Sequence, residues 1–202
     1  MPKKVIVLLA EGFEEVEAVT PIDYLRRAGI DVTIAAVGSG IPGKSPIVKG
    51  SHGIQITADT AFHILFADGN KPVTADWDGV IVPGGLPGSD NLAASKEVGV
   101  FLKAMADAGK LVCAICAAPA RVLSPLGLLA GKNFTCLPGE EKAVSGSASA
   151  AAVWKSDRVV VDGNTITSRG AGTAGEFACT VISKLLSETD GKKLAERVLL
   201  LF

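Results

Sequence analysis

The sequence lacks the charge pattern of proteins that bind nucleic acids or anionic membranes. Over 202 residues the formal net charge is −1, and no block of like charges occurs, so neither partner is expected. The apolar runs are too short for a membrane-spanning helix, which needs about 20 such residues. Residues 5–10 follow two lysines and faintly resemble a signal peptide, but acidic residues follow at once. We therefore expect a soluble cytoplasmic protein with no nucleic-acid or membrane partner.

Cysteine and histidine are also scarce, which limits disulfide, metal and redox chemistry. The sequence contains only Cys113, Cys116, Cys136, Cys179, His52 and His63. The four cysteines suggest no disulfide framework and fit a reducing compartment. Cys113 and Cys116 have C-x-x-C spacing, but on a strand entering a turn their side chains point to different places, which argues against a thioredoxin-type dithiol. Because no second C-x-x-C exists, we expect no metal site, and no cofactor is implied.

The composition is that of a globular protein with a sizeable core, since 48% of the residues are apolar and 20% are charged. Buried strands alternate with amphipathic helices, which predicts a three-layer α/β/α sandwich with a mostly parallel sheet in one domain, residues 1–202. The expected strands cover residues 4–10, 31–37, 47–49, 54–57, 78–82, 111–115, 133–137, 158–161 and 165–167. The expected helices cover residues 14–29, 91–105, 120–129, 174–186 and 190–201.

Two of these helices carry specific local predictions. In the first, Val16, Val19, Ile22 and Leu25 form the expected apolar stripe, and Pro21 predicts a kink or a broken turn. In the fourth, apolar residues recur with the clearest helical period of the chain, and the preceding Thr173 is expected to cap the helix.

The stretch around Cys116 organises the rest of the chain. A buried strand at residues 111–115 turns sharply at Cys116 into small residues and Pro119. This is the pattern of a nucleophile elbow, with cysteine in place of serine. Because a helix N-terminus favours an anion, we expect the Cys116 thiol to ionise more easily than a free thiol, whose pKa is about 8.5. The alternative is a buried core cysteine without a chemical role.

Ligands of parallel sheets bind beyond the carboxyl ends of the strands, so the loops at residues 11–17, 83–88 and 116–118 are expected to converge. Glu17 would then lie beside the thiol, where its carboxyl group either is protonated and donates a hydrogen bond or repels a thiolate. The backbone N–H groups of Gly85 and Ala117 are candidates for an oxyanion hole.

Three other residues are weighed for the same site. Gly84 precedes Gly85 in a tight turn that lets the backbone approach a ligand closely. His52 lies in a polar loop and is either simply solvated or part of the site. Arg169 is interpreted as a structural or interface residue rather than a catalytic one.

The segments AEGFEEVEAVTPIDYLRRAGI, VPGGLPGSDNL, AICAAPA and TSRGAGT resemble the signature segments of the DJ-one (Parkinson-disease-associated deglycase) branch of the ThiJ/PfpI superfamily. They match in order and spacing over almost the full chain. The resemblance implies a flavodoxin-like sandwich and a homodimer. It also implies an oxidation-sensitive cysteine at Cys116, a protonated partner at Glu17 and oxyanion-binding amides at Gly85 and Ala117.

The chain departs from this family pattern in four places. Leu137 stands where the animal members have histidine, His52 where arginine is common, and Ala171 where proline is common. We place His52 and Ala171, with Gly84, among the substrate-binding residues. Ala117 stands where the protease-like branch has histidine, so a peptidase is not expected.

Three functions follow as hypotheses. The first is a cysteine-dependent, cofactor-free glyoxalase or deglycase that acts on small 2-oxoaldehydes such as methylglyoxal, giving lactate, or on their early protein adducts. The second is a redox sensor or redox-controlled chaperone, in which Cys116 is oxidised to a sulfinate. The third is a binding module with a vestigial pocket. Homologues labelled as thiazole (thiamine) biosynthesis proteins exist, but no feature of this sequence supports that activity.

Overall fold

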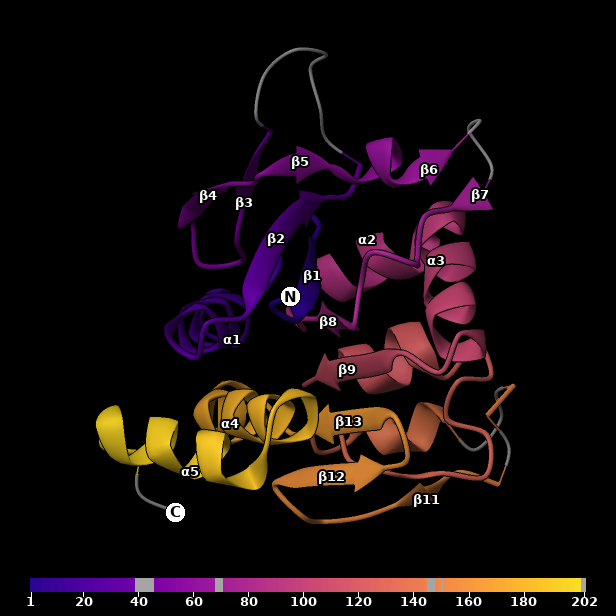
Figure 1. The fold of residues 1–202 in the computed structure, drawn as a ribbon. Coiled ribbons are helices and arrows are strands. Elements are labelled where there is room, and N and C mark those ends of the chain that lie inside the picture. The colour runs from indigo at the N-terminus through magenta and orange to yellow at the C-terminus, as the bar shows by residue number, and fades with distance from the viewer. Residues whose placement is uncertain (39–45, 68–70, 145–147, 150, 201–202) are drawn as a thin grey trace.

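The computed structural model describes residues 1–38, 46–67, 71–144, 148–149 and 151–200. A seven-stranded sheet crosses its centre in the order β12-β13-β9-β8-β1-β2-β5 (Figure 1). Its strands are β1 (Lys4–Leu9), β2 (Asp31–Ala36), β5 (Thr60–Ala61), β8 (Gly79–Val82), β9 (Leu111–Ile115), β12 (Val159–Asp162) and β13 (Thr165–Ser168). All neighbours pair in parallel except β12 and β13, which form an antiparallel hairpin.

Helices cover both faces of the sheet (Figure 1). One face carries α1 (Glu15–Arg27), α4 (Ala174–Leu185) and α5 (Glu188–Arg197), and the other carries α2 (Gly88–Ala94), α3 (Lys96–Asp107) and a π-helix, Pro119–Leu123. Strand β1 shows why the sheet is buried on both sides: Val5, Val7 and Leu9 join the apolar cluster under α1 and α4, and Ile6 and Leu8 join the cluster under α3. The predicted flavodoxin-like three-layer sandwich is confirmed.

Short elements lie around this frame. Three two-stranded sheets are formed by β3 (Ile47–Lys49) with β4 (Gln55–Thr57), β6 (Phe66–Ala67) with β7 (Lys71–Pro72), and β10 (Asn133–Phe134) with β11 (Val153–Trp154). Short 3₁₀ helices span Phe62–Leu65, Glu140–Ala143 and Ala171–Thr173. Among the helices of the described ranges, none combines the length and the apolar character needed to cross a bilayer.

Several helix predictions need correction. The expected helix at residues 91–105 is two helices, because Ser95 adopts an extended conformation between them and its Oγ accepts a hydrogen bond from Val98 N. The expected helix at 120–129 is the five-residue π-helix followed by turns. The last helix, α5, ends at Arg197 rather than at residue 201. Thr173 precedes α4 but makes no side-chain cap, because its hydroxyl binds Ser168 and Gly170 instead.

Helix α1 and the strand at residues 133–137 also differ from the prediction. Helix α1 continues through Pro21 without a break, and its buried face is formed by Ala18, Pro21, Ile22 and Leu25 among others. Val16 and Val19, by contrast, are 48% and 44% exposed, so the predicted stripe is wrong in its first half. The strand is limited to β10, Asn133–Phe134.

Candidate active site

Cys116 directly follows β9 and turns the chain sharply. Its φ of 64° lies in the left-handed region, which residues with a Cβ rarely adopt. Its backbone is held on both sides, since its N–H donates to Ser168 O (2.9 Å) and its C=O accepts from Leu137 N–H (2.8 Å). Three of the four cysteines are buried, and Cys116 is the one with intermediate exposure. The elbow predicted from the sequence is therefore present, with a partly exposed cysteine at its tip.

Glu17 lies in the first turn of α1 and points to this sulfur. Its side chain is 1% exposed, and its Oε2 accepts a hydrogen bond from Gly84 N–H at 2.9 Å. The carboxyl group also hydrogen-bonds the Cys116 thiol and the Ala171 backbone N–H. Burial is the largest influence on Glu17 and raises its pKa from 4.5 to about 7. The carboxyl group therefore exchanges its proton close to neutral pH.

The pKa of the thiol differs from the expectation. Burial, followed by the negative charge of Glu17, raises the pKa of Cys116 from 9.0 to about 12. Hydrogen bonds from the backbone amides of Ala117 and Gly85 act in the opposite direction but are smaller. The prediction that Cys116 ionises more easily than a free thiol is therefore wrong. At neutral pH the proton is on the sulfur, and Glu17 is the neighbouring group that can take it.

The loops after β1, β8 and β9 converge at this point, as the strand-end rule predicts. Gly85 and Ala117 direct their amides to the sulfur. Gly84 is confined between the two reactive groups, because a Cβ there would lie 2.5 Å from Glu17 Oε2 and 2.6 Å from Cys116 Cβ. The backbone therefore approaches the thiol and the carboxyl group more closely than a residue with a side chain would allow.

Ala171 also reaches the site, through the hydrogen bond of its backbone N–H to Glu17. The loop that carries it is fixed by two hydroxyl groups: Thr173 Oγ1 lies 2.7 Å from Ser168 Oγ and accepts from Gly170 N–H at 3.1 Å. Neither Ser168 nor Thr173 was predicted to belong to the site. Their spacing in the segment SRGAGT was the signal available in the sequence.

His52 lies apart from the thiol, at a group of acidic residues near the start of α1. Its Nδ1 is 2.8 Å from Glu15 Oε2 and 4.0 Å from Glu14 Oε1, and its side chain is 71% exposed. The hydrogen bond to Glu15 raises the pKa of His52. The contacts of His52 are therefore with Glu14, Glu15 and Ser51 rather than with the reacting atoms. The buried Glu15, which also accepts from His52 N–H at 2.7 Å, was missed by the sequence analysis.

The same three residues, Glu14, Glu15 and His52, are close enough to hold a metal ion, with ligand atoms within 4.8 Å of one another. Their atoms are already used, however. Glu14 Oε2 accepts from Glu17 N–H at 2.7 Å and so caps α1, and Glu15 accepts hydrogen bonds from the loop that carries His52. The cluster is explained as a helix cap and a loop anchor.

Two further residues considered from the sequence are Arg169 and Leu137. Arg169 donates from Nη1 to Ser156 O at 2.9 Å, which fits a structural role. Leu137 supports the elbow through its backbone N–H and offers no titratable group.

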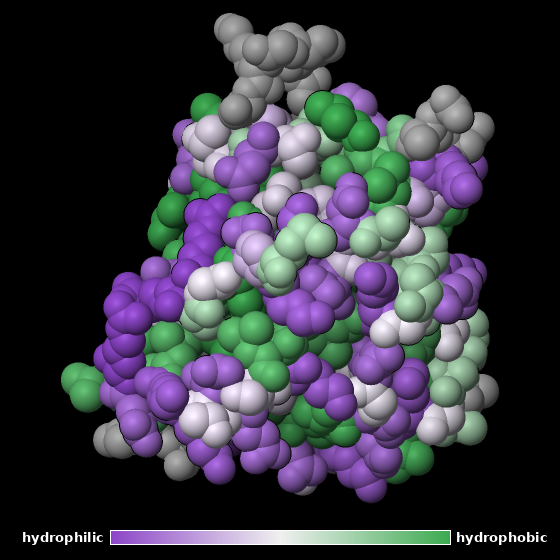
Figure 2. Space-filling model, viewed as in Figure 1, coloured by the Kyte–Doolittle hydropathy of each residue, from purple (hydrophilic) through white to green (hydrophobic). Residues whose placement is uncertain are grey.

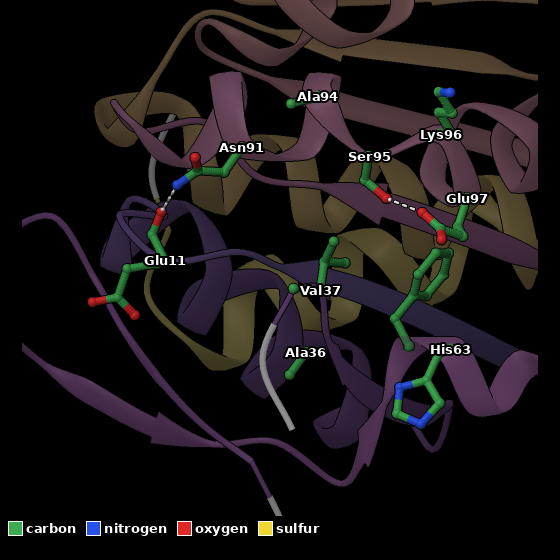
Figure 3. A pocket seen from close by; sticks show the side chains of 11 residues that line it. Glu11, Ala36, Val37, His63, Asn91, Ala94, Ser95, Lys96 and Glu97 are labelled. Carbon is green, nitrogen blue, oxygen red and sulfur yellow. Dashed lines mark hydrogen bonds between the residues drawn. The ribbon is translucent and has the colours of Figure 1, made fainter. Parts of the chain in front are cut away.

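A separate cavity of about 800 Å³ opens beside the carboxyl ends of β1 and β2 (Figure 3). Glu11, His63, Asn91 and Ser95 are among its lining residues, and Asn91 Nδ2 donates to Glu11 O at 2.8 Å. Neither Cys116 nor Glu17 lines it. Cys116 and Glu17 therefore lie outside this cavity.

Comparisons with known proteins show the family and support the fold. The model of the DJ-1/PfpI family matches residues 3–184. Protein dj-1beta of Drosophila melanogaster is 37% identical over the full length of both chains, and its crystal structure matches with a TM-score of 0.86, covering both chains completely. A deglycase of Pyrococcus abyssi is 30% identical over 84% of this chain and 91% of its own. The structure of oxidized Toxoplasma gondii DJ-1 matches with a TM-score of 0.85 at 33% identity, covering 99% of this chain and all of that one.

Proposed function

The chain belongs to the DJ-1/PfpI family, and from this premise we propose that it is a cysteine-dependent enzyme acting on small 2-oxoaldehydes such as methylglyoxal, or on their early protein adducts. The observation that carries the proposal is the meeting of the Cys116 thiol, the Glu17 carboxyl group and the amides of Gly85 and Ala117. The similar protein of Pyrococcus abyssi is named a deglycase, which supports the same chemistry. The reaction needs no metal, glutathione or other cofactor.

In the first step, Cys116 Sγ attacks the aldehyde carbon. The C–S bond forms, and the carbonyl electron pair moves to oxygen, where the amides of Gly85 and Ala117 stabilise the negative charge. The Glu17 carboxylate accepts the thiol proton and passes it to this oxygen, which gives a hemithioacetal. Because the pKa of Cys116 is raised to about 12, a base at this position is required for the attack at neutral pH.

In the second step, Glu17 removes the hydrogen of the sulfur-bearing carbon as a proton and delivers it to the neighbouring carbon, while the hydroxyl proton of the hemithioacetal moves to the former ketone oxygen. The product is a thioester of a 2-hydroxy acid, so one carbon is oxidised and the other is reduced without an external oxidant. Water then cleaves the C–S bond, which releases lactate when the substrate is methylglyoxal and restores the thiol.

This mechanism fixes the sign of the pH dependence. Glu17 acts as a base, and its pKa is about 7. The kcat/KM is therefore expected to rise as the pH increases through about 7 and to level off above it. A rate that falls over the same pH interval would contradict the role of Glu17 as a base.

The central experiment is lactate formation from methylglyoxal by the fully reduced protein, beside Glu17→Gln and Cys116→Ser. Both variants are expected to lose turnover. Cys179→Ser is the matched control, because Cys179 is buried in α4 and takes no part in the site. A Cys116→Ser variant with full activity would exclude the proposed mechanism.

The second candidate function is a redox sensor or redox-controlled chaperone that uses the same cysteine. It is favoured by the exposure of Cys116 relative to the buried Cys113 and Cys136, and by the amides and protonatable Glu17 that would hold a sulfinate. The similar Toxoplasma gondii structure is described as oxidized. Absence of turnover by the reduced parent protein, together with the gain of two oxygen atoms at Cys116 under mild peroxide, would favour this function.

A homodimer is part of the proposal. Val16 and Val19 on α1 and Ile54 beside β4 expose apolar side chains, and a second copy of the chain would bury such residues. In the view of Figure 2, hydrophobic patches lie between hydrophilic residues across the surface. The proposed location remains the cytoplasm, where a free reactive thiol stays reduced.

A further inference from the structure

Arg121 belongs to the π-helix that follows Cys116, and the proposed mechanism gives its side chain no role. The guanidinium group forms three hydrogen bonds to carboxylates. Nε and Nη2 donate to the two oxygens of Glu140 at 2.8 and 3.0 Å, and Nη1 donates to Asp90 Oδ1 at 2.9 Å. The side chain is 33% exposed. Such a fork fixes the direction of an arginine more tightly than a single ion pair does.

The contact with Asp90 links the two segments that carry the amides facing the thiol. Arg121 N–H donates to Ala117 C=O at 2.9 Å, so the backbone of Arg121 holds the peptide group that follows Ala117. Asp90 follows Ser89 in α2, and Ser89 N–H donates to Gly85 C=O at 2.8 Å. One arginine thus joins the loop after β8 to the turn after β9.

The contact with Glu140 connects the guanidinium to the backbone of the nucleophile. Glu140 N–H donates to Leu137 C=O at 3.0 Å, and Leu137 N–H donates to Cys116 C=O at 2.8 Å. The segment from Leu137 to Glu140, which contacts the backbone of Cys116, is therefore also held by the side chain of Arg121.

We propose that Arg121 is a positioning residue, whose guanidinium sets the amides of Gly85 and Ala117 at the correct distance from the Cys116 sulfur. Its contribution to folding stability is expected to be small, because partly exposed ion pairs contribute little. Its contribution to the rate is expected to be larger, because donors displaced by about 1 Å can lower a rate by about 100-fold. The kinetic part of this inference rests on the proposed function.

The test compares Arg121→Ala and Arg121→Lys with Arg26→Ala. Arg26 is the matched control, because it also joins two segments, donating to Val32 O at 3.0 Å and to Asp59 Oδ2 at 3.3 Å. For lactate formation, the kcat of Arg121→Ala is expected to fall about tenfold or more, with KM changed less than about twofold. Lysine cannot form the fork and is expected to give an intermediate kcat. Arg26→Ala is expected to match the parent protein.

A second measurement does not depend on turnover: the rate at which iodoacetamide alkylates Cys116 at pH 8, followed by peptide mapping. Misplaced amides hold a thiolate less well, so alkylation is expected to slow several-fold in both Arg121 variants. A merely loosened structure would expose the sulfur and speed alkylation. Faster or unchanged alkylation in both variants would overturn the inference, even if kcat fell. If the parent protein forms no lactate, the proposed enzyme function fails, and the alkylation rates still decide the role of Arg121.

Discussion

Replacing Glu17 by glutamine tests the raised pKa through protein stability, independently of any substrate. On folding, the pKa of Glu17 rises from 4.5 to about 7, mainly because the carboxyl group is buried. Between these two values the folded protein keeps a proton that the unfolded chain releases. The free energy of unfolding therefore falls as the pH rises. The stabilising contribution is fully present below pH 4.5 and is lost as the pH rises through about 7.

The magnitude follows from the same two values. At 1.36 kcal/mol per pH unit, the difference between 4.5 and about 7 corresponds to about 3 kcal/mol. Glutamine cannot ionise, so Glu17→Gln lacks this pH dependence but retains an oxygen that can accept from Gly84 N–H. Relative to the parent protein, the variant is expected to gain about 3 kcal/mol of stability between pH 4 and pH 8.

The assay is urea unfolding of both proteins at several pH values, with the difference in unfolding free energy plotted against pH. Taking the difference removes the titration of every other group that behaves equally in the two proteins. Only the change with pH is interpreted, because new hydrogen bonds of glutamine can shift the whole curve. A difference that stays constant within about 0.5 kcal/mol, or that moves in favour of the parent protein as the pH rises, would refute the assignment.

Three further predictions concern single positions. Gly84→Ala is expected to abolish lactate formation in a turnover assay, because its Cβ would collide with Glu17 Oε2 and Cys116 Cβ at 2.5 and 2.6 Å; substantial activity would show that the loop can move aside. Phe177→Ala is expected to lower the free energy of unfolding by about 3–5 kcal/mol in urea, because the ring is fully buried between α4 and the sheet; a loss below about 1 kcal/mol would contradict this. Val19→Asp is expected to convert the proposed homodimer to a monomer in light scattering, and an unchanged mass would exclude α1 from the interface.

The sheet could be predicted well because its strands are buried on both faces. The run KVIVLL of β1 has no polar face, which only a covered central strand tolerates. The helices were predicted less accurately, because their boundaries depend on single contacts. The break at Ser95 needs the hydrogen bond from Val98 N–H, and the exposed positions of Val16 and Val19 cannot be read from apolar spacing alone.

The residues around the thiol also differ in whether the sequence predicts their position. Glu17, Gly85 and Ala117 could be placed because each follows the carboxyl end of a strand, and parallel strands bring those ends together. Glu15 and Arg121 could not, because their partners are far away in the sequence. Glu15 binds His52, 37 residues later, and Arg121 joins Asp90, 31 residues earlier. The spacing of residues in the sequence does not predict such long-range pairs.

The reactivity expected of Cys116 rested partly on a helix that was predicted wrongly. An α-helix over residues 120–129 would have directed a macrodipole at the sulfur and favoured the thiolate. The structure has a π-helix of only five residues there, and the backbone amides of Ala117 and Gly85 are the groups that lower the pKa of Cys116. Burial and the Glu17 charge then dominate and keep the proton on sulfur. A thiol of this kind depends on the neighbouring base for its reactivity, so Glu17→Gln is expected to reduce turnover as severely as Cys116→Ser does.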